Sequence, residues 1–90
     1  MEKRFKLRAE HVYAMLNDQD YKCFVSGVKL TYQNLELAYK IPLYIGGKHE
    51  LSNVCLVDRS LKELKKFKTN EEIVIICKEI IKNAIRLSNH

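Results

Sequence analysis

The most informative stretch of the chain is LELAYKIPLYIGGKHELSNV, which occupies residues 35–54. Its first five residues alternate along the chain in the way that predicts a strand over 35–39. Residues 41–49 hold the lone proline and two of the three glycines, which predicts a loop with a demanding backbone path. Residues 52–57 predict a second strand, and the polar side chains at 58–60 offer caps for a short helix that ends near residue 66. The pattern is therefore strand, loop, strand and helix.

The segments on either side of this unit predict a helix and a hairpin before it and a helix after it. A ragged apolar stripe predicts a helix over 7–16, which the turn residues at 17–20 end. Residues 21–25 predict a short strand, which a turn at Ser26 and Gly27 returns to residues 28–30.

The final helix has the clearest start signal in the chain. Thr69 and Glu72 have the spacing of a capping box. After them, apolar residues recur at helical offsets: Ile73, Ile76, Cys77, Ile80, Ile81, Ala84 and Leu87. Val74, Ile75 and Ile85 lie off this stripe. A helix buried on two sides explains them, and so does a contact with a second copy or a partner.

Length and composition predict one small domain over residues 1–90 with an α+β fold. The chain has 90 residues, of which 47% are hydrophobic and 30% charged, and no apolar run is long enough to span a membrane. The three cysteines, Cys23, Cys55 and Cys77, are an odd number at wide spacing, which fits neither a disulfide framework nor a zinc ribbon. Reduced thiols of this kind are typical of a cytoplasmic protein.

Positive charge is concentrated directly after the second predicted strand. The net charge of the chain is +5, and residues 59–68 hold five cations against the single acid Glu63. Clustered positive charge in a small domain favours a polyanionic partner, most often nucleic acid. A solvated, lysine-rich helix face explains the same charges.

Residues 35–54 closely resemble the core of the HNH endonucleases, the ββα-metal family. In that family the segment reads as apolar-Asp-His, Ile-x-Pro-Leu, Gly-Gly and Leu-Ser-Asn-apolar, and this chain has IPL at 41–43, GG at 46–47 and LSNV at 51–54. Residues 21–27 resemble the family's Cys-x-x-Ser-Gly turn, and residues 58–65 stand where the family has its last helix. The resemblance implies an HNH-like ββα core over about residues 35–66 and a phage or mobile-element ancestry.

The resemblance also implies that the catalytic chemistry is lost. In the family a histidine is the general base, the aspartate beside it binds a divalent metal, and an Asn or His on the last helix completes the metal site. This chain has Ala38 at the aspartate position, Tyr39 at the histidine position and Lys62 on the last helix. Alanine has no ligand atom, a tyrosine hydroxyl is ordinarily protonated at neutral pH, and an ammonium repels a dication. We therefore expect no catalytic residue, no bound metal and no cofactor.

Of the family's four chemistry-bearing positions Asn53 is the one retained, and in the family it ties the loop and orients the base. We expect it to act in the loop together with Pro42, Gly46, Gly47 and His49.

The leading functional prediction is a catalytically inactive, HNH-like protein that binds nucleic acid, with duplex DNA as the expected form, through the basic former active-site face. Lys62 would place a fixed positive charge where the family has its dication, so that a phosphate is bound and not cleaved. The expected contacts are Lys40, Arg59, Lys62, Lys65, Lys66 and Lys68.

Two other functions fit the same pattern. The first is a protein-interaction module, such as a phage-derived inhibitor or accessory subunit that acts on host machinery. The second, and least favoured, is an active nuclease with an altered site. None of the three involves a membrane, and the oligomeric state is left open.

Overall fold

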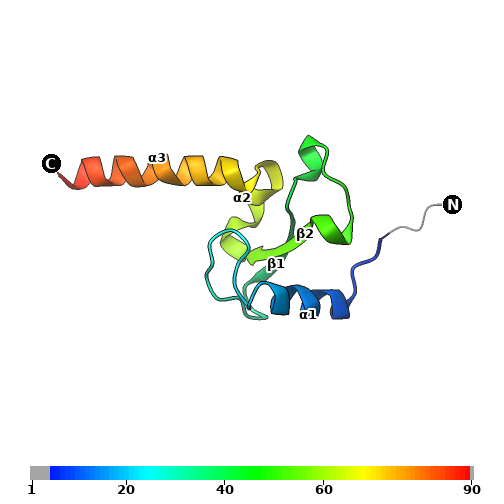
Figure 1. The fold of residues 1–90 in the computed structure, drawn as a ribbon. Coiled ribbons are helices and arrows are strands. Elements are labelled where there is room, and N and C mark those ends of the chain that lie inside the picture. Colours follow the sequence, from blue (N-terminus) through cyan, green and yellow to red (C-terminus); the bar gives the residue numbers. More distant parts are fainter. Residues whose placement is uncertain (1–4, 90) are drawn as a thin grey trace.

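The computed structural model describes residues 5–89, so residues 1–4 and 90 of the predicted single domain lie outside the described residues. The fold is mixed α+β, as predicted, with helices around a two-stranded sheet (Figure 1). The elements are α1 (Ala9–Asp18), β1 (Leu35–Tyr39), β2 (Val54–Asp58), α2 (Lys62–Phe67) and α3 (Asn70–Ser88), with 3-10 turns η1 (Leu43–Ile45), η2 (Leu51–Asn53) and η3 (Arg59–Leu61).

β1 and β2 are antiparallel and form the centre of the molecule. Ala38 lies opposite Cys55 in the register, and Tyr39 lies opposite Val54. Residues 54–57 of β2 are all buried, because α1 packs against β2 on one side and α2 packs beside β1 on the other (Figure 1). Met15 and Leu16 are the buried residues of α1 in this core.

Two element boundaries differ from the sequence predictions by two residues. The first helix runs over 9–18 and not 7–16, because the extended backbone of Arg8 makes that residue the N-cap. The second strand begins at Val54, since residues 51–53 form the turn η2.

The predicted hairpin over residues 21–30 forms only in part. An isolated antiparallel bridge joins Lys22 to Lys29, and the Cys23 amide donates to the Val28 carbonyl at 2.7 Å, but no regular strand is present. Asp20 and Tyr21 both have φ of 55°, a left-handed conformation that no strand adopts, so the first strand of the hairpin cannot start at residue 21. The following residues form a turn in which the Ser26 amide donates to the Sγ of Cys23 at 3.4 Å.

The outer edge of β2 is occupied by a side chain where a third strand would otherwise pair. The Gln19 amide nitrogen donates to the carbonyl of Leu56 at 2.9 Å, and its oxygen accepts the Leu56 amide at 2.9 Å. The backbone amide of Phe24 donates to the same carbonyl at 2.9 Å. These bonds satisfy the backbone of Leu56 without a third strand.

α3 begins as the capping box predicts. The Glu72 amide donates to the Thr69 hydroxyl at 3.2 Å, and the Thr69 amide donates to the Glu72 carboxylate at 3.0 Å. Ile73, in the first turn, is the one residue of this helix that is buried within the described part of the chain.

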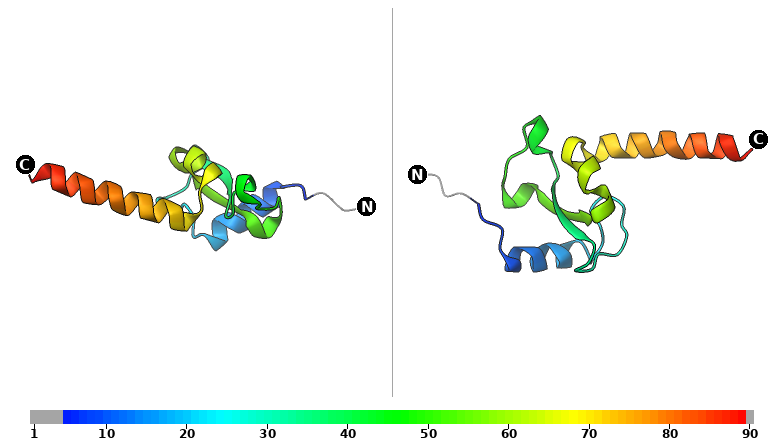
Figure 2. Two further views of the ribbon diagram at one scale, coloured as in Figure 1. Left: turned by 90° about the horizontal axis from the view of Figure 1, so that it is seen from above. Right: turned by 180° about the vertical axis from the view of Figure 1, so that it is seen from behind.

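Beyond its first turn, α3 projects away from the rest of the molecule. All three views show it as a rod that leaves the body beside α2 (Figures 1 and 2). The radius of gyration is 15.3 Å, whereas a compact domain of this length has about 12 Å. The prediction of a core helix buried on two sides is therefore wrong, because the apolar residues that follow the first turn meet no second layer.

Candidate functional site

The loop between β1 and β2 is closed by the side chain of Asn53. Its Oδ1 accepts the amide of Ile41 at 2.8 Å, and its Nδ2 donates to the carbonyls of Ile41 at 3.0 Å and Lys48 at 2.8 Å. Its backbone carbonyl accepts the amide of Lys40 at 2.7 Å. Asn53 is buried, so these three side-chain bonds are shielded from water and join both ends of the loop.

The two glycines of the loop are required for different reasons. Gly46 has φ of 101°, a left-handed conformation that ends η1. Gly47 donates its amide to the carbonyl of the buried Pro42 at 3.0 Å, and a Cβ at Gly47 would overlap the carbonyl of Ile41. Position 46 therefore requires a residue that adopts a left-handed backbone conformation, and position 47 requires a residue without a Cβ.

Gly47→Ala is expected to lower the free energy of unfolding by about 2 kcal/mol, since the added methyl must push the backbone of residue 41 aside. Gly46→Ala meets open space and is expected to lose only about 1 kcal/mol through backbone strain. Urea denaturation of both variants measures the difference. An equal or larger loss for Gly46→Ala would contradict the crowding at position 47.

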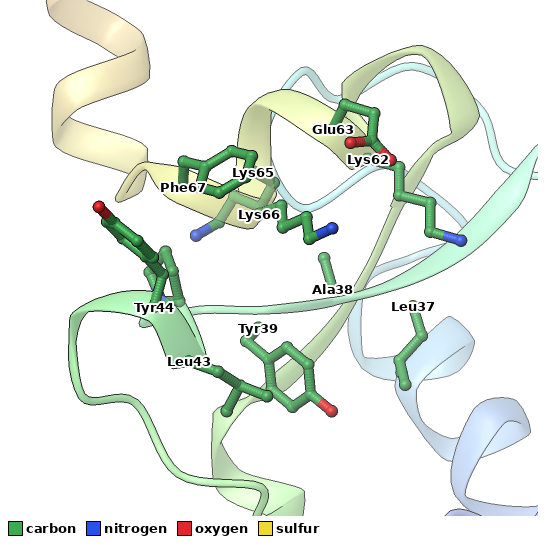
Figure 3. A pocket seen from close by; sticks show the side chains of 11 residues that line it. Leu37, Ala38, Tyr39, Leu43, Tyr44, Lys62, Glu63, Lys65, Lys66 and Phe67 are labelled. Atoms are coloured by element: carbon green, nitrogen blue, oxygen red, sulfur yellow. The ribbon is translucent and has the colours of Figure 1, made fainter.

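A cavity of about 450 Å³ lies between β1, η1 and α2 (Figure 3). The three positions where this chain departs from the HNH pattern, Ala38, Tyr39 and Lys62, all line it. The other lining residues are Leu37, Pro42, Leu43, Tyr44, Glu63, Lys65, Lys66 and Phe67. The rings of Tyr44 and Phe67 meet edge to face with centroids 5.5 Å apart, and Phe67 is a wall residue that the sequence reasoning missed.

The residues at the three family positions do not fit a divalent metal. Ala38 supplies no ligand atom, and the Tyr39 hydroxyl lies 2.9 Å from Nδ1 of His49. The Nζ of Lys62 lies 3.4 Å from the carboxylate of Glu36. Over residues 5–89, no three His, Cys, Asp or Glu side chains are grouped so that they could hold a metal ion.

His49 joins the loop to β1 and to the N-terminal segment. Besides its hydrogen bond to Tyr39, its ring lies 4.9 Å from the ring of Phe5, centroid to centroid. His49 thus contacts both β1 and the N-terminal segment from its place in the loop.

Arg59 and Lys62 share one carboxylate. Nε of Arg59 lies 3.5 Å and Nζ of Lys62 lies 3.4 Å from oxygens of Glu36. The cluster therefore keeps one net positive charge. Sequence reasoning missed Glu36, although its place on β1 two residues before Ala38 puts it on the same face of the strand.

The expectation that Lys65 contacts nucleic acid is wrong, because its side chain is fully buried. Its Nζ donates to the carbonyls of Lys40 at 2.6 Å and Lys68 at 3.1 Å. Burial lowers the pKa of the Lys65 ammonium from its ordinary value. The helical spacing from Leu61 and Leu64 places residue 65 on the inner face of α2, a position where a lysine is not expected from its charge.

The remaining predicted cations are divided between two sides of the molecule. Lys66 is exposed at the cavity, with its Nζ 5.6 Å from the centroid of the Phe67 ring, and Lys68 is half-buried just after α2. Lys40 lies elsewhere, with its Nζ 5.5 Å from the centroid of Phe24, at a hollow between α1 and β2. Lys62 and Lys66 thus line one cavity, and Lys40 does not join them.

Comparison with known proteins adds no relative: no family model, curated protein or solved structure matches the chain. The HNH resemblance stays a prediction from the sequence motif. Among residues 5–89 there is no helix with the length and apolar character needed to cross a membrane.

Proposed function

We propose that this protein is a catalytically inactive, HNH-like protein that binds nucleic acid at the cavity between β1, η1 and α2. One observation carries the proposal: Ala38, Tyr39 and Lys62 line the same cavity as Lys66. Lysine ammonium groups neutralise backbone phosphates, and this term dominates the affinity of nucleic-acid-binding proteins. At the positions where the HNH pattern has its metal ligands and general base, this chain has Ala38, Tyr39 and Lys62, so the fixed charge supplied there is the positive charge of Lys62.

The geometry reduces the number of cations that can reach a phosphate. Lys65 is buried and Lys40 lies at another hollow, so neither belongs to the proposed surface. Lys68 is half-buried and does not line the cavity, so Arg59, Lys62 and Lys66 remain as the main contacts. Glu36 competes with phosphate for the first two. Binding is therefore expected to be weak and independent of sequence.

Aromatic side chains beside these cations support the proposal. Tyr44 is 76% exposed and Phe67 is 48% exposed, and both line the cavity next to Lys66. Exposed aromatic faces beside cations stack on bases wherever strands are unpaired. A single-stranded oligonucleotide is therefore the informative comparison with duplex DNA.

With three phosphate contacts, the logarithm of the affinity for duplex DNA is expected to fall with the logarithm of salt concentration at a slope of about −2.7. Lys66→Ala is expected to weaken binding several-fold and to reduce the slope by about one. Lys82→Ala is the matched control, because this lysine is exposed on the projecting part of α3. Fluorescence anisotropy at several salt concentrations measures both, and the DNA should be recovered intact after incubation with magnesium or manganese.

Absence of binding to duplex and single-stranded oligonucleotides at low salt would overturn this proposal. Equal losses for Lys66→Ala and Lys82→Ala would place the contact surface elsewhere. The protein-interaction alternative would then be preferred, and it has support of its own in the apolar walls that Leu37, Leu43 and Phe67 give the cavity.

A further inference from the structure

The projecting part of α3 carries an apolar face that nothing in the described chain covers. Ile73 is 1% exposed, whereas Ile80, Ile81 and Leu87 on the same face are 60%, 58% and 57% exposed. Their offsets of seven, eight and fourteen from Ile73 keep them on one side of the helix. The face that docks the first turn against the body therefore continues, uncovered, along the rod seen in Figure 2.

A helix of this kind needs a partner to be stable. The part of α3 beyond Ile73 covers residues 74–88, and isolated helices shorter than about 12–15 residues are marginal in water even for alanine-rich sequences. Most helical stability in proteins comes from the packing of an apolar face. Seven of the 19 residues of α3 are valine or isoleucine, which have lower helix propensity than straight-chain residues. Neither intrinsic propensity nor the contact at Ile73 accounts for the full length of the helix.

The charges of α3 indicate what the partner is. Residues 70–79 hold three glutamates and one lysine, and residues 80–88 hold Lys82 and Arg86 with no acid. The first half of the helix is therefore acidic and the second half basic. If a second α3 lies alongside in the opposite direction, the acidic half of each helix faces the basic half of the other. The dipoles of the two helices then point in opposite directions, which is also favourable.

We propose that this chain forms a two-fold dimer in which α3 packs in antiparallel orientation against α3 of a second copy. Ile73, Ile80 and Leu87 repeat at intervals of seven, with Ile76 between the first two, which is the spacing of a helix-pairing seam. Glu72, Glu79 and Arg86 repeat at the same interval directly beside this seam. These flanking positions form the ion pairs between paired helices.

The burial of Ile73 sets the overlap of the two helices. Because Ile73 already packs within its own subunit, the uncovered part of the seam runs from the half-buried Ile76 to the exposed Leu87. Antiparallel overlap of this segment brings Glu79 beside Arg86 of the partner subunit, and the two-fold axis repeats the pair. The dimer is built from one helix of each copy, so it is smaller than the roughly 800 Å² per partner of a standard interface, and its dissociation should be visible on dilution.

Sedimentation equilibrium of the full chain over a range of concentrations tests the dimer. The wild type is expected to pass from monomer to twice the monomer mass, and Ile80→Glu is expected to stay monomeric. Ile75→Glu is the matched control: it changes the same residue type in the same helix, at 62% against 60% exposure, on the opposite face. A monomeric wild type at every concentration, or equal effects of the two variants, would overturn the proposal.

A charge swap tests the orientation. Arg86→Glu is expected to weaken the dimer, and adding Glu79→Arg to it is expected to restore association, because the pair re-forms with its charges exchanged. A double variant that stays as weak as Arg86→Glu alone would overturn the antiparallel arrangement. All of these measurements are made without nucleic acid, so their result is independent of the function proposed above.

Discussion

Asn53→Ala is expected to lower the free energy of unfolding by about 3–4 kcal/mol, the largest effect of any single substitution considered for this chain. The variant loses three hydrogen bonds and leaves the amide and the carbonyl of Ile41 without their partner, whereas the carbonyl of Lys48 still accepts the amide of Glu50 at 3.0 Å. Each buried polar group left unpaired costs about 1–3 kcal/mol, and water that enters the loop recovers part of that cost. This loss is a large fraction of the total stability of a small domain, which is about 5–15 kcal/mol. Because the lost hydrogen bonds all lie in the loop, the loop should open before the rest of the domain unfolds.

Urea denaturation followed by circular dichroism measures the loss. Asn17→Ala is the control, since Asn17 is exposed on α1 and such surface substitutions change stability by less than about 0.5 kcal/mol. A loss for Asn53→Ala as small as that of the control would mean that the backbone alone holds the loop. Hydrogen exchange at the amide of Ile41 provides a local measurement, and its protection should fall in the variant.

Lys65→Ala is expected to cost about 3 kcal/mol, and its neighbour Lys66→Ala less than about 0.5 kcal/mol. The ammonium of Lys65 donates to the carbonyls of Lys40 and Lys68, so it joins the end of β1 to the end of α2. Hydrogen bonds from a charged donor contribute about 1.5–3 kcal/mol each, and the cost of burying the charge offsets part of this. Lys66 is exposed and adjacent, which makes it a control of the same residue type on the same helix.

Lys65→Met separates the packing of the apolar stem of Lys65 from the hydrogen bonds that its ammonium donates. Methionine retains the apolar stem and its packing and removes the donor, so Lys65→Met should lose less stability than Lys65→Ala and more than Lys66→Ala. Thermal unfolding followed by circular dichroism ranks the three variants. Equal midpoints for Lys65→Ala and Lys66→Ala would contradict the structural role of the buried ammonium.

The sequence predicts well those features that depend on neighbours along the chain. The alternation over 35–39, the glycines and proline of the loop and the Thr69–Glu72 capping box each act within a few residues, and the structure contains a strand, a tight loop and a helix start there. The mixed α+β class follows from these segments.

The errors arise where residues distant in sequence meet. Tyr21 was expected in a strand, and its left-handed backbone belongs to a segment whose Gln19 bonds to β2, 37 residues away. Lys65 has the sequence context of a surface cation, but in the fold its ammonium donates a hydrogen bond to the carbonyl of Lys40, 25 residues away. The apolar stripe on α3 predicts that the helix packs against another element, but periodicity does not say whether that element lies in the same chain.

The bonds of Gln19 to β2 also bear on aggregation. VCLV, at 54–57 of β2, is the kind of short apolar segment with high β propensity that nucleates cross-β stacking when its edge is open. The Gln19 amide engages both backbone groups of Leu56 in the middle of that edge, so an incoming strand must first break both bonds. One side chain thus protects an aggregation-prone segment of this small protein, so that the edge of β2 does not compete with the helix pairing proposed for α3.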